Sequence, residues 1–392
     1  MIKPKGTLDI FSNIDTYNYI ISTFKQICEL QGYKQIITPH FEYKDLFINN
    51  DQKEIFIFDD EYALKPENTA SIVRAYLENK LYANNFNKFY YISSMFRKDS
   101  PQRGRYREFT QLGIELFNQA NPLSDIEVLI SAYEFLKRLN IVNTLFINTI
   151  GCLECRINYI NILKEYLQKQ DLCEDCKKRL INNPLRILDC KKCKFDNIPH
   201  IIDYVCNDCK KHFQFILSYL NYINIPYIID HNLVRGLDYY TQTVFEFKSN
   251  QLEAAQSTII GGGRYNNLIQ IKNNYIPAIG YAAGLERLML LFNKDEKIKN
   301  YVYIISKNYK QDVLRLYRLL LCHNIPTKIT YTNNSLTKQL KSIKNCKYVI
   351  IIEDDEINNN YYTIKNLNNS TQVQIDKNYI IGYLLNSKGE IK

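Results

Sequence analysis

The chain has 392 residues, of which 46% are hydrophobic and 23% are charged. This composition indicates a globular protein of two or three domains, and it includes no run of the roughly 18 apolar residues that a membrane-spanning helix needs. Because the first residues carry two lysines with no apolar stretch behind them, we expect no secretory signal, no membrane partner and a cytoplasmic protein.

The formal net charge of +9 at pH 7 is unevenly distributed along the chain. Residues 301–392 carry 13 lysines and arginines against seven aspartates and glutamates, a balance of +6. A basic terminal module on a near-neutral body suits a nucleic-acid partner. A surface that merely keeps the protein in solution would have the same charge.

The first part of the chain predicts a helix, a strand and a hairpin before a polar turn. Apolar periodicity and turn residues place them as follows: a helix over 16–30, a strand after Gly32 that ends at Pro39, and a hairpin over 55–58 and 62–64. The turn Lys65-Pro-Glu-Asn-Thr-Ala70 then leads into a helix. We expect the Thr69 hydroxyl to cap that helix.

The stretch from Lys88 to Glu115 predicts two strands, 89–97 and 105–115, joined by a polar turn. With the strand period of two, one face of the second strand presents Arg105, Arg107, Phe109, Gln111, Gly113 and Glu115. Two cations, an amide and an acid on one face are typical of the floor of a binding pocket. The alternative is an exposed sheet face that carries ion pairs.

The middle of the chain predicts a helical block between two sheet-forming regions. Its expected elements are a helix over 129–138, a strand over 144–150, helices over 158–168, 174–181 and 210–222, and a strand over 226–229. The next stretch, Leu233 to Glu246, sets Arg235 and Gly236 before an acid and the tyrosines Tyr239 and Tyr240. A β-branched and aromatic run follows and predicts a strand.

Two glycine-rich stretches and a basic terminal region complete the chain. Gly261-Gly-Gly-Arg264 follows a short strand over 258–260, and Ala278 to Leu288 spaces glycines at a strand-to-helix junction that ends in Glu-Arg. The elements expected after residue 300 are strands over 302–305, 326–330 and 348–353 and helices over 310–322 and 335–342. This alternation predicts α/β layers with a largely parallel sheet. Behind Ser335 as the cap, Lys338, Lys341 and Lys344 would form a basic helix face.

Eight of the eleven cysteines form four Cys-x-x-Cys pairs, at 152/155, 173/176, 190/193 and 206/209. Paired cysteines at such spacing in a chain without a secretion signal predict a zinc site rather than disulfides. Because four thiolates complete a tetrahedral site, we expect Cys173, Cys176, Cys206 and Cys209 to bind zinc, since these two pairs flank helices. Cys190 and Cys193 are the alternates, and Cys152/Cys155 is expected to hold no metal. The alternative is reduced structural thiols.

These motifs resemble, in kind and order, those of class II aminoacyl-tRNA synthetases of subclass IIa. The helix, strand and Pro39 resemble motif 1; Phe96-Arg97 with Arg105-x-Arg-Glu-Phe resembles motif 2; and Ala278 to Leu288 resembles motif 3. Leu233 to Glu246 resembles the histidine-specific signature of the histidyl-tRNA synthetase family. Lys65-Pro-Glu-Asn-Thr departs from that family's Arg-Pro-Glu-Gly-Thr at its first and fourth residues, and an asparagine at position 68 tolerates positive φ.

The resemblance implies a fold and a domain division. The expected fold class is α+β, with a class II antiparallel-sheet catalytic domain, a helical insertion and a C-terminal α/β anticodon-binding domain. The implied boundaries are 1–155 and 226–294 for the two parts of the catalytic domain, 156–225 for the insertion, and 300–392 for the anticodon-binding domain. In the family, the insertion leans on the tRNA acceptor stem and motif 1 forms a homodimer interface.

The resemblance also implies the site residues and their roles. Arg97 and Arg235 would be the catalytic residues, on opposite sides of the ATP α-phosphate, where a fixed guanidinium stabilises developing negative charge. The implied ATP-binding residues are Arg97, Arg105, Gly280, Gly284 and Arg287. The implied histidine-binding residues are Glu67, Thr69, Gln111, Glu115, Arg235, Tyr239 and Tyr240. In the family, the acid at position 67 reaches the ammonium group of the histidine.

The implied activity is that of a histidine–tRNA ligase. ATP with Mg²⁺ and L-histidine would give histidyl-adenylate, from which tRNA(His) takes the histidine; structural Zn²⁺ would complete the cofactors. A non-catalytic relative, such as the regulatory subunit of ATP phosphoribosyltransferase, is the alternative; it usually lacks motif residues and the terminal domain. A zinc-bearing RNA-binding protein without enzyme activity is the third interpretation.

Overall fold

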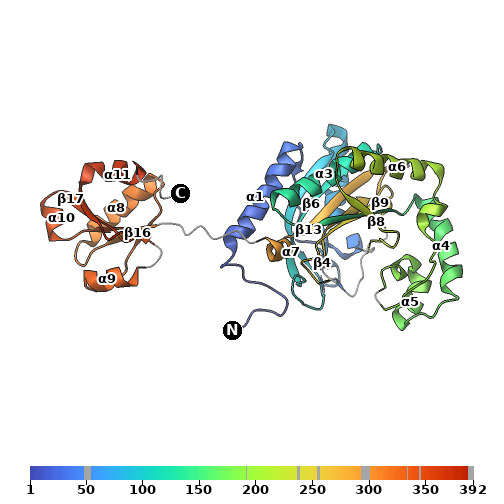
Figure 1. Ribbon diagram of the computed structural model, residues 1–392, viewed down its shortest axis with the longest axis horizontal. Helices are drawn as coiled ribbons and strands as arrows, with labels where there is room; N and C mark the ends of the chain where they lie inside the picture. The colour runs from blue at the N-terminus through green and yellow to red at the C-terminus, as the bar shows by residue number, and fades with distance from the viewer. Residues whose placement is uncertain are drawn as a thin grey trace. The chain divides into compact units, whose positions relative to one another are not determined.

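The computed structural model describes residues 1–47, 54–190, 192–235, 239–253, 257–292, 301–332, 334–343 and 346–386. The chain divides into two compact units, Met1–Lys294 and Asp295–Lys392, which are both drawn in Figure 1. None of the helices in these described ranges is long and apolar enough to cross a membrane.

The first unit is built on an eight-stranded sheet. Its strands, from one edge to the other, are β1 (Lys34–Gln35), β5 (Lys88–Phe96), β6 (Glu108–Phe117), β13 (Ala278–Gly284), β10 (Thr258–Arg264), β9 (Thr241–Lys248), β7 (Thr144–Thr149) and β8 (Tyr227–Ile229). The six central strands pair antiparallel, as predicted, whereas β1 and β8 pair parallel to their neighbours, so the sheet is mixed. Parallel pairing requires a long crossover connection between the two strands, because a short hairpin joins only antiparallel strands. Such long segments separate β1 from β5 and β7 from β8.

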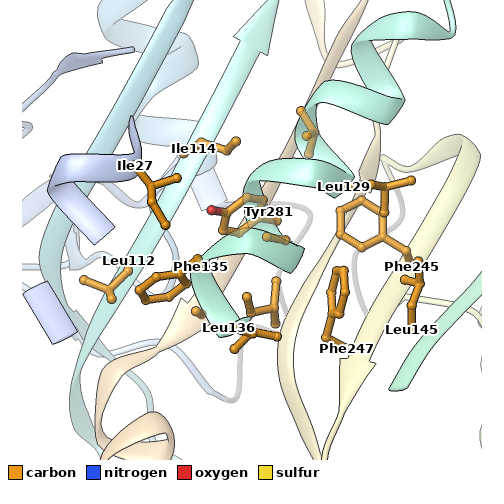
Figure 2. Packing of buried hydrophobic residues seen from close by; sticks show 14 of the residues in the cluster. Ile27, Leu112, Ile114, Leu129, Phe135, Leu136, Leu145, Phe245, Phe247 and Tyr281 are labelled. Carbon is orange, nitrogen blue, oxygen red and sulfur yellow. The ribbon is translucent and has the colours of Figure 1, made fainter. Parts of the chain in front are cut away.

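Four helices cover one face of this sheet and supply the main core. They are α1 (Ile14–Leu30), α3 (Leu123–Arg138), α6 (Asn207–Tyr222) and α7 (Leu285–Leu291). Figure 2 shows Phe135 of α3 and Ile27 of α1 near Leu112 and Ile114 of β6, with Phe245 and Phe247 of β9 further along the same core. Leu112 and Ile114 point into this core, so Gln111, Gly113 and Glu115 lie on the opposite face, as the period of two predicts.

The predicted hairpin is confirmed as part of a separate three-stranded sheet. Its strands are β2 (Phe41–Tyr43), β4 (Tyr62–Leu64) and β3 (Ile57–Phe58), in that order across the sheet. The helix α2 (Thr69–Glu78) follows. Thr69 does not cap it, contrary to prediction; the carboxylate of Glu67 accepts hydrogen bonds from the amides of Thr69 (2.6 Å) and Ala70 (3.1 Å) instead.

The backbone at Asn68 does not adopt positive φ. Its φ is −111°, in the region open to all residues, so the glycine of the family's motif is not required by the backbone here. The Asn68 side chain instead accepts a hydrogen bond of 2.8 Å from the Thr38 hydroxyl, to which Lys65 also donates at 3.1 Å. The two departures from the family's motif therefore share one buried partner.

The helical block contains α4 (Leu153–Leu167) and α5 (Glu174–Asn182), which lie together beside the edge strand β8 in Figure 1. The helix α4 begins five residues before the predicted start at 158, directly after Cys152. The third helix of the block, α6, packs through Phe213, Ile216 and Leu220 into the main core. The block is thus anchored to the sheet by its last helix.

The second unit has a five-stranded sheet of its own. The order across it is β15 (Thr327–Ile329), β14 (Tyr301–Ile305), β16 (Cys346–Ile351), β17 (Tyr361–Asn366) and β18 (Gln372–Asp376). The first three strands are parallel, as predicted, but β17 and β18 add an antiparallel hairpin that was not predicted. Its asparagine-rich turn, Asn366 to Thr371, was the available sequence signal.

Four helices accompany this second sheet: α8 (Lys310–Cys322), α9 (Leu336–Ser342), α10 (Asp354–Asn358) and α11 (Ile380–Asn386). The helix α9 begins at the predicted place, although the Ser335 side chain makes no capping hydrogen bond. Lys338 and Lys341 belong to α9, whereas Lys344 lies outside the described residues. A separate hydrophobic core, which includes Val302, Leu316 and Ile350, holds the unit together.

Candidate active site

A cavity of about 270 Å³ opens on the face of the large sheet that the helices leave free. Its lining residues are Glu67, Thr69, Tyr91, Arg97, Asp99, Gly104, Arg105, Tyr106, Phe109, Gln111, Arg235, Tyr239, Tyr240, Thr258, Ile259, Gly261, Ala282, Gly284, Glu286 and Arg287. Most site residues predicted from the motifs therefore meet here, although the segments that carry them are far apart in the sequence. This volume lies near the lower limit of the roughly 300–1000 Å³ that is usual for small-molecule sites.

Arginines dominate one end of the cavity. Arg97 donates through Nε to the carbonyl of Pro66 (2.7 Å) and stacks on Phe109 with its guanidinium carbon 5.2 Å from the ring centre. Arg287 donates to the carbonyls of Thr258 and Gly104. Within the described residues, neither guanidinium forms a salt bridge with a carboxylate. Their positive charges are therefore available to an anion.

The electrostatics of Arg287 show that the cations converge. Burial lowers its pKa from the usual arginine value, and the positive charges of Arg105 and Arg97 lower it further. Arg105 differs from these two, because Asp99 accepts two hydrogen bonds from it at 2.7 and 2.8 Å. Its charge is thereby largely matched in the protein itself.

Arg235 lies flat on the glycine-rich strand β10. A Cβ atom added at Gly261 would come within 2.5 Å of the Arg235 guanidinium, so only glycine leaves room for it. The guanidinium pairs with Glu246 of β9, which also accepts a hydrogen bond of 2.9 Å from the Thr258 hydroxyl. The next three motif residues, 236–238, including Asp238, lie outside the described residues.

Two buried carboxyl groups lie at the other end of the cavity, opposite the arginines. Glu115 accepts hydrogen bonds from the hydroxyls of Thr69 (2.7 Å) and Tyr265, and burial raises its pKa to about 8. Glu67 is also buried, which raises its pKa, although the amides of Ala70 and Thr69 partly offset the shift. Both acids are held by uncharged donors and can accept a cation.

Tyrosines complete the acidic end. Tyr239 and Tyr240 pack together, with ring centres 4.9 Å apart, and Tyr239 also meets the ring of Tyr265 at 5.6 Å. Tyr91 of β5 donates a hydrogen bond of 3.0 Å to the side chain of Gln111. Its ring fills the space above Gly113, where a Cβ atom would come within 2.5 Å. The predicted residues Gln111, Tyr239 and Tyr240 thus share an aromatic wall.

Gly280 and Gly284, both predicted to bind ATP, take different places. Gly284 lines the cavity, whereas Gly280 lies one layer deeper. A Cβ atom at Gly280 would come within 2.0 Å of the Glu115 carboxylate, so its visible effect is to make room for that acid. Arg105 and Arg107 precede β6, which begins at Glu108, and are not part of the strand face that was predicted to include them.

The motif analysis did not select five of the residues that shape the site. Tyr91, Tyr265 and Glu246 position other site residues, Glu286 lines the cavity, and Thr258 binds Arg287 and Glu246. The available signals were short-range: Tyr265 follows the glycine triplet, Glu246 closes the Arg235 stretch, and Glu286 stands beside Arg287. Their partners lie on other strands, which sequence spacing does not report.

The cysteine pairs meet in two clusters, and neither cluster is the predicted ligand set. The first cysteine cluster is Cys152, Cys155, Cys206 and Cys209; the second cysteine cluster is Cys173, Cys176, Cys190 and Cys193. In each, all four sulfur atoms lie within 4.8 Å of one another. The predicted set combined one pair from each cluster, and the pair predicted to hold no metal, Cys152/Cys155, belongs to the first cluster. Spacing identifies pairs, but the fold decides which pairs meet.

Comparisons with known proteins bear on the whole chain. A family profile described as "Histidyl-tRNA synthetase" matches residues 12–171 and 202–288, and one described as "Anticodon binding domain" matches residues 299–387. A histidine–tRNA ligase of Halothermothrix orenii is 42% identical over 402 residues, which cover 95% of this chain and 96% of that protein.

Solved structures agree with these sequence matches. The structure of apo histidyl-tRNA synthetase from S. aureus is similar with a TM-score of 0.82 at 31% identity, covering 98% of this chain and 99% of that one. A Bacillus halodurans protein described as an ATP phosphoribosyltransferase regulatory subunit/histidyl-tRNA synthetase has a TM-score of 0.67 at 21% identity, covering 89% and 97%. At that identity the likeness shows a shared fold alone.

Proposed function

The chain belongs to the histidyl-tRNA synthetase family and is a histidine–tRNA ligase, and we propose that the cavity on the large sheet is where it activates histidine. The observation that carries this assignment is the opposed chemistry of the two ends. One end offers the unpaired cations of Arg97 and Arg287, and the other offers the buried acids Glu67 and Glu115. ATP and an amino acid need these two environments side by side.

The cation-rich end would bind ATP. Arg97 and Arg287 would contact phosphate oxygens, Arg105 the triphosphate, and Gly284, with Gly280 beneath it, the adenine side. Attack of the histidine carboxylate on the α-phosphorus builds charge on the non-bridging oxygens, and expels pyrophosphate. Arg97 and Arg235 would stabilise that charge from opposite sides, and their fixed positions remove the need to reorganise during the reaction.

Magnesium would accompany the ATP phosphates, and the cavity contains a group that fits it. One oxygen of Glu286 accepts a hydrogen bond from the amide of Thr110, whereas the other is buried without a partner among the described residues. Carboxylate oxygens are preferred Mg²⁺ ligands. We assign Glu286 to hold this ion beside the phosphates, where it would neutralise charge on the leaving pyrophosphate.

The acid-lined end would bind L-histidine. Glu67 and Glu115 supply negative charge for its cationic groups, and Thr69 and Gln111 supply hydrogen bonds. Tyr239 and Tyr240 form a wall against the imidazole, while Arg235 would meet the carboxylate as it approaches the phosphate. Each of these residues lines the cavity except Glu115, which lies directly beneath it.

The activated histidine then passes to tRNA(His), whose terminal ribose attacks the adenylate. We propose residues 1–155 and 226–294 as the catalytic domain, 156–225 as an insertion near the acceptor end, and 300–392 as the anticodon-binding domain. The match of residues 299–387 to an anticodon-binding profile and the +6 charge of the terminal region support the last assignment. Because tRNA is the substrate, we propose that the protein acts in the cytoplasm.

We further propose that the protein is a homodimer through the three-stranded sheet β2–β4–β3. Phe41, Tyr43, Phe58 and Tyr62 pack there in edge-to-face and tilted pairs, with ring centres 5.4–5.9 Å apart. Phe41 and Tyr43 are 51% and 61% exposed. A contiguous exposed aromatic face of this kind is typical of a protein interface.

The direct test is ATP–pyrophosphate exchange with each amino acid in turn. Exchange that depends on histidine, and charging of tRNA(His) by the full chain, are the expected results. Exchange with another amino acid in preference to histidine would overturn the assignment of the acid-lined end. Structural zinc would fit the two cysteine clusters, because thiolates are its preferred ligands. The exchange assay measures activity separately from the zinc content.

A further inference from the structure

We propose that this chain binds two structural zinc ions, one in each cysteine cluster, and that the first fastens the helical block to Tyr240, the residue directly before β9. The second would close a small lobe away from the cavity. The role given to the first ion rests on the proposed histidine-binding function, whereas the number of ions does not.

The sulfur positions fit a single tetrahedral ion in each cluster. The sulfur atoms of Cys152 and Cys155 are 3.5 Å apart, and those of Cys173 and Cys190 are 3.9 Å apart. With Zn–S bonds of about 2.3 Å, tetrahedral geometry separates ligand sulfurs by roughly 3.8 Å. A disulfide would bring two sulfurs to about 2 Å, and all the cysteines are free thiols.

Backbone amides support the sulfurs of the first cluster in a crosswise pattern. The amide of Cys152 donates to the sulfur of Cys209 (3.2 Å), and the amide of Cys206 donates to the sulfur of Cys155 (3.1 Å). Each pair thus orients a sulfur of the other pair. Hydrogen bonds of this kind stabilise thiolates and fix the direction of metal ligands.

The second cluster has the same support from amides. Cys173 donates to the sulfur of Cys193 (3.3 Å), and the sulfur of Cys190 accepts from the amides of Lys192 and Cys193, both at 3.4 Å. Reduced cysteines that served only as small apolar residues would not need amides directed at their sulfur atoms. The recurrence of this pattern in both clusters distinguishes ligands from core thiols.

Helix ends add a second, shared feature. Cys152, Cys173 and Cys206 are the N-cap residues of α4, α5 and α6, and each is followed by its pair partner in the first turn. The positive end of a helix stabilises a thiolate. In the first cluster two such ends, from α4 and α6, converge, so an ion there would join two helix starts whose cysteines lie 51 or more positions apart in the sequence.

The first cluster is connected to the histidine end of the cavity through β9. Cys152 follows Gly151, whose carbonyl accepts a hydrogen bond of 2.7 Å from the amide of Gln242. One turn into α4, Arg156 donates to the carbonyl of Tyr240 (2.9 Å). An ion that holds the start of α4 therefore holds the backbone of Tyr240, a residue of the cavity wall.

The second cluster is linked to Tyr240 by packing alone: Cys176 and Tyr240 belong to one hydrophobic core, but within the described residues no hydrogen bond to its sulfur atoms comes from β9. Its cysteines fall in residues 172–201, the part of the chain that the family profile leaves unmatched, and none of them lines the cavity. Around it, Tyr159 and Tyr166 of α4 donate to the carbonyls of Pro199 and Asp196. An ion here would fix the lobe formed by α5 and the turn after it.

Metal analysis of the full chain, purified without chelator, tests the number of ions without any substrate. Two zinc ions per chain are expected, and Co²⁺ added in their place should give thiolate absorption that saturates at two equivalents. Iron in place of zinc, one ion per chain, or none would overturn the proposal. Histidine-dependent exchange by the same preparation tests the proposed function separately, so the two can fail independently.

Paired variants separate the two clusters. Cys155→Ser with Cys209→Ser should leave one ion and raise the KM for histidine by about 10- to 100-fold, as loss of orienting partners around a site does. Cys176→Ser with Cys190→Ser should also leave one ion but change that KM by less than about twofold. Cys322→Ser, at an exposed position outside both clusters, is the matched control.

The design also covers variants that fold poorly. Cys155→His and Cys176→His keep a zinc-binding side chain, so each should retain both ions and the wild-type KM more closely than the serine variants. If variants of the two clusters change the histidine KM equally, or if the serine variants retain both ions, the separate roles are wrong.

Discussion

The two ends of the cavity hold opposite charges by the same means. At one end, Arg97 and Arg287 donate to backbone carbonyls; at the other, Glu67 and Glu115 accept from amides and hydroxyls. Uncharged partners fix the direction of an ionisable group without supplying a charge of opposite sign, and a substrate of opposite charge can then offset the free-energy cost of burying the charged form. Arg235 departs from this rule, because Glu246 already matches its charge.

The largest effect should follow from removing Arg235. Arg235→Ala is expected to lower histidine-dependent exchange by about 10²- to 10³-fold, since loss of one group that stabilises an oxyanion costs about 2.7–4 kcal/mol. Arg315→Ala, at a side chain 82% exposed in the second unit, is the control. Exchange near the wild-type rate would mean that Arg97 alone stabilises the charge on the α-phosphate. It would also mean that the ion pair with Glu246 neutralises the charge of Arg235.

Glu246→Gln sharpens that result. It removes the counter-charge but keeps a hydrogen-bond acceptor, so Arg235 should keep its place over Gly261. Loss of activity as large as in Arg235→Ala would show that the ion pair positions the arginine, whereas a smaller loss would show that its charge is what matters.

A smaller effect, with a pH signature, is expected at the acid-lined end. Glu115→Gln should raise the KM for histidine by roughly 10- to 100-fold, the usual cost of losing a hydrogen bond to a charged group. Because the pKa of Glu115 is raised to about 8, the free site holds a proton below that pH. The wild-type KM should therefore fall as the pH rises from 7 to 8, and the variant should lose this dependence.

The same ionisation affects stability in a defined direction. The folded pKa of about 8 exceeds the usual value of 4.5, so the folded state binds the extra proton between these values. The free energy of unfolding should thus decrease as the pH rises through this window. Glu115→Gln should remove that decrease, and Glu165→Gln, at an exposed position on α4, should not. An unchanged slope would show that Glu115 is already ionised.

Removing the second unit should affect neither end of the cavity. A chain that ends near residue 294 keeps the whole first unit and its core, so histidine-dependent exchange should change by less than about threefold. Charging of tRNA should fall far more, and the tRNA affinity of the full chain should decrease with salt, as phosphate contacts require. Equal loss of both activities would place part of the catalytic site in the second unit.

The smallest effect should come from Asn68→Gly. This change restores the residue of the family's motif, but Asn68 has negative φ and accepts a hydrogen bond from Thr38. We expect a loss of about 1 kcal/mol in stability, the usual net value of one hydrogen bond, and a histidine KM close to wild type. A gain in stability on thermal unfolding would show that the asparagine is strained.

The sequence predicts parts of the site unequally, for physical reasons. Gln111 and Glu115 could be assigned to one face because side chains alternate along a strand, and β6 obeys this rule. The partners of these residues could not be assigned from the sequence. Tyr91 lies on β5 and Tyr265 directly follows β10, and the positions of both depend on the strand register of the folded sheet. The antiparallel hairpin of the second unit was missed although Val373 and Ile375 alternate with polar residues in β18, so a local signal was present there.

The cysteines show the same boundary between local and non-local information. The spacing within each Cys-x-x-Cys pair suits the first turn of a helix, which local sequence specifies. The pairing of 152/155 with 206/209 depends on α6 returning to the sheet through Phe213 and Leu220. The zinc ligands were predicted from the residues that flank each pair, and these residues carry no information about that packing.

The glycines under the cavity set a limit for redesign of amino-acid preference. Gly113 lies beneath Tyr91, Gly261 beneath Arg235, and Gly280 beneath Glu115. Glycine is the smallest residue, so any substitution at these three floor positions adds volume and displaces the side chain packed against it. Variants that accept a larger amino acid must therefore be sought in the walls, whereas floor substitutions would select only smaller ones or abolish activity.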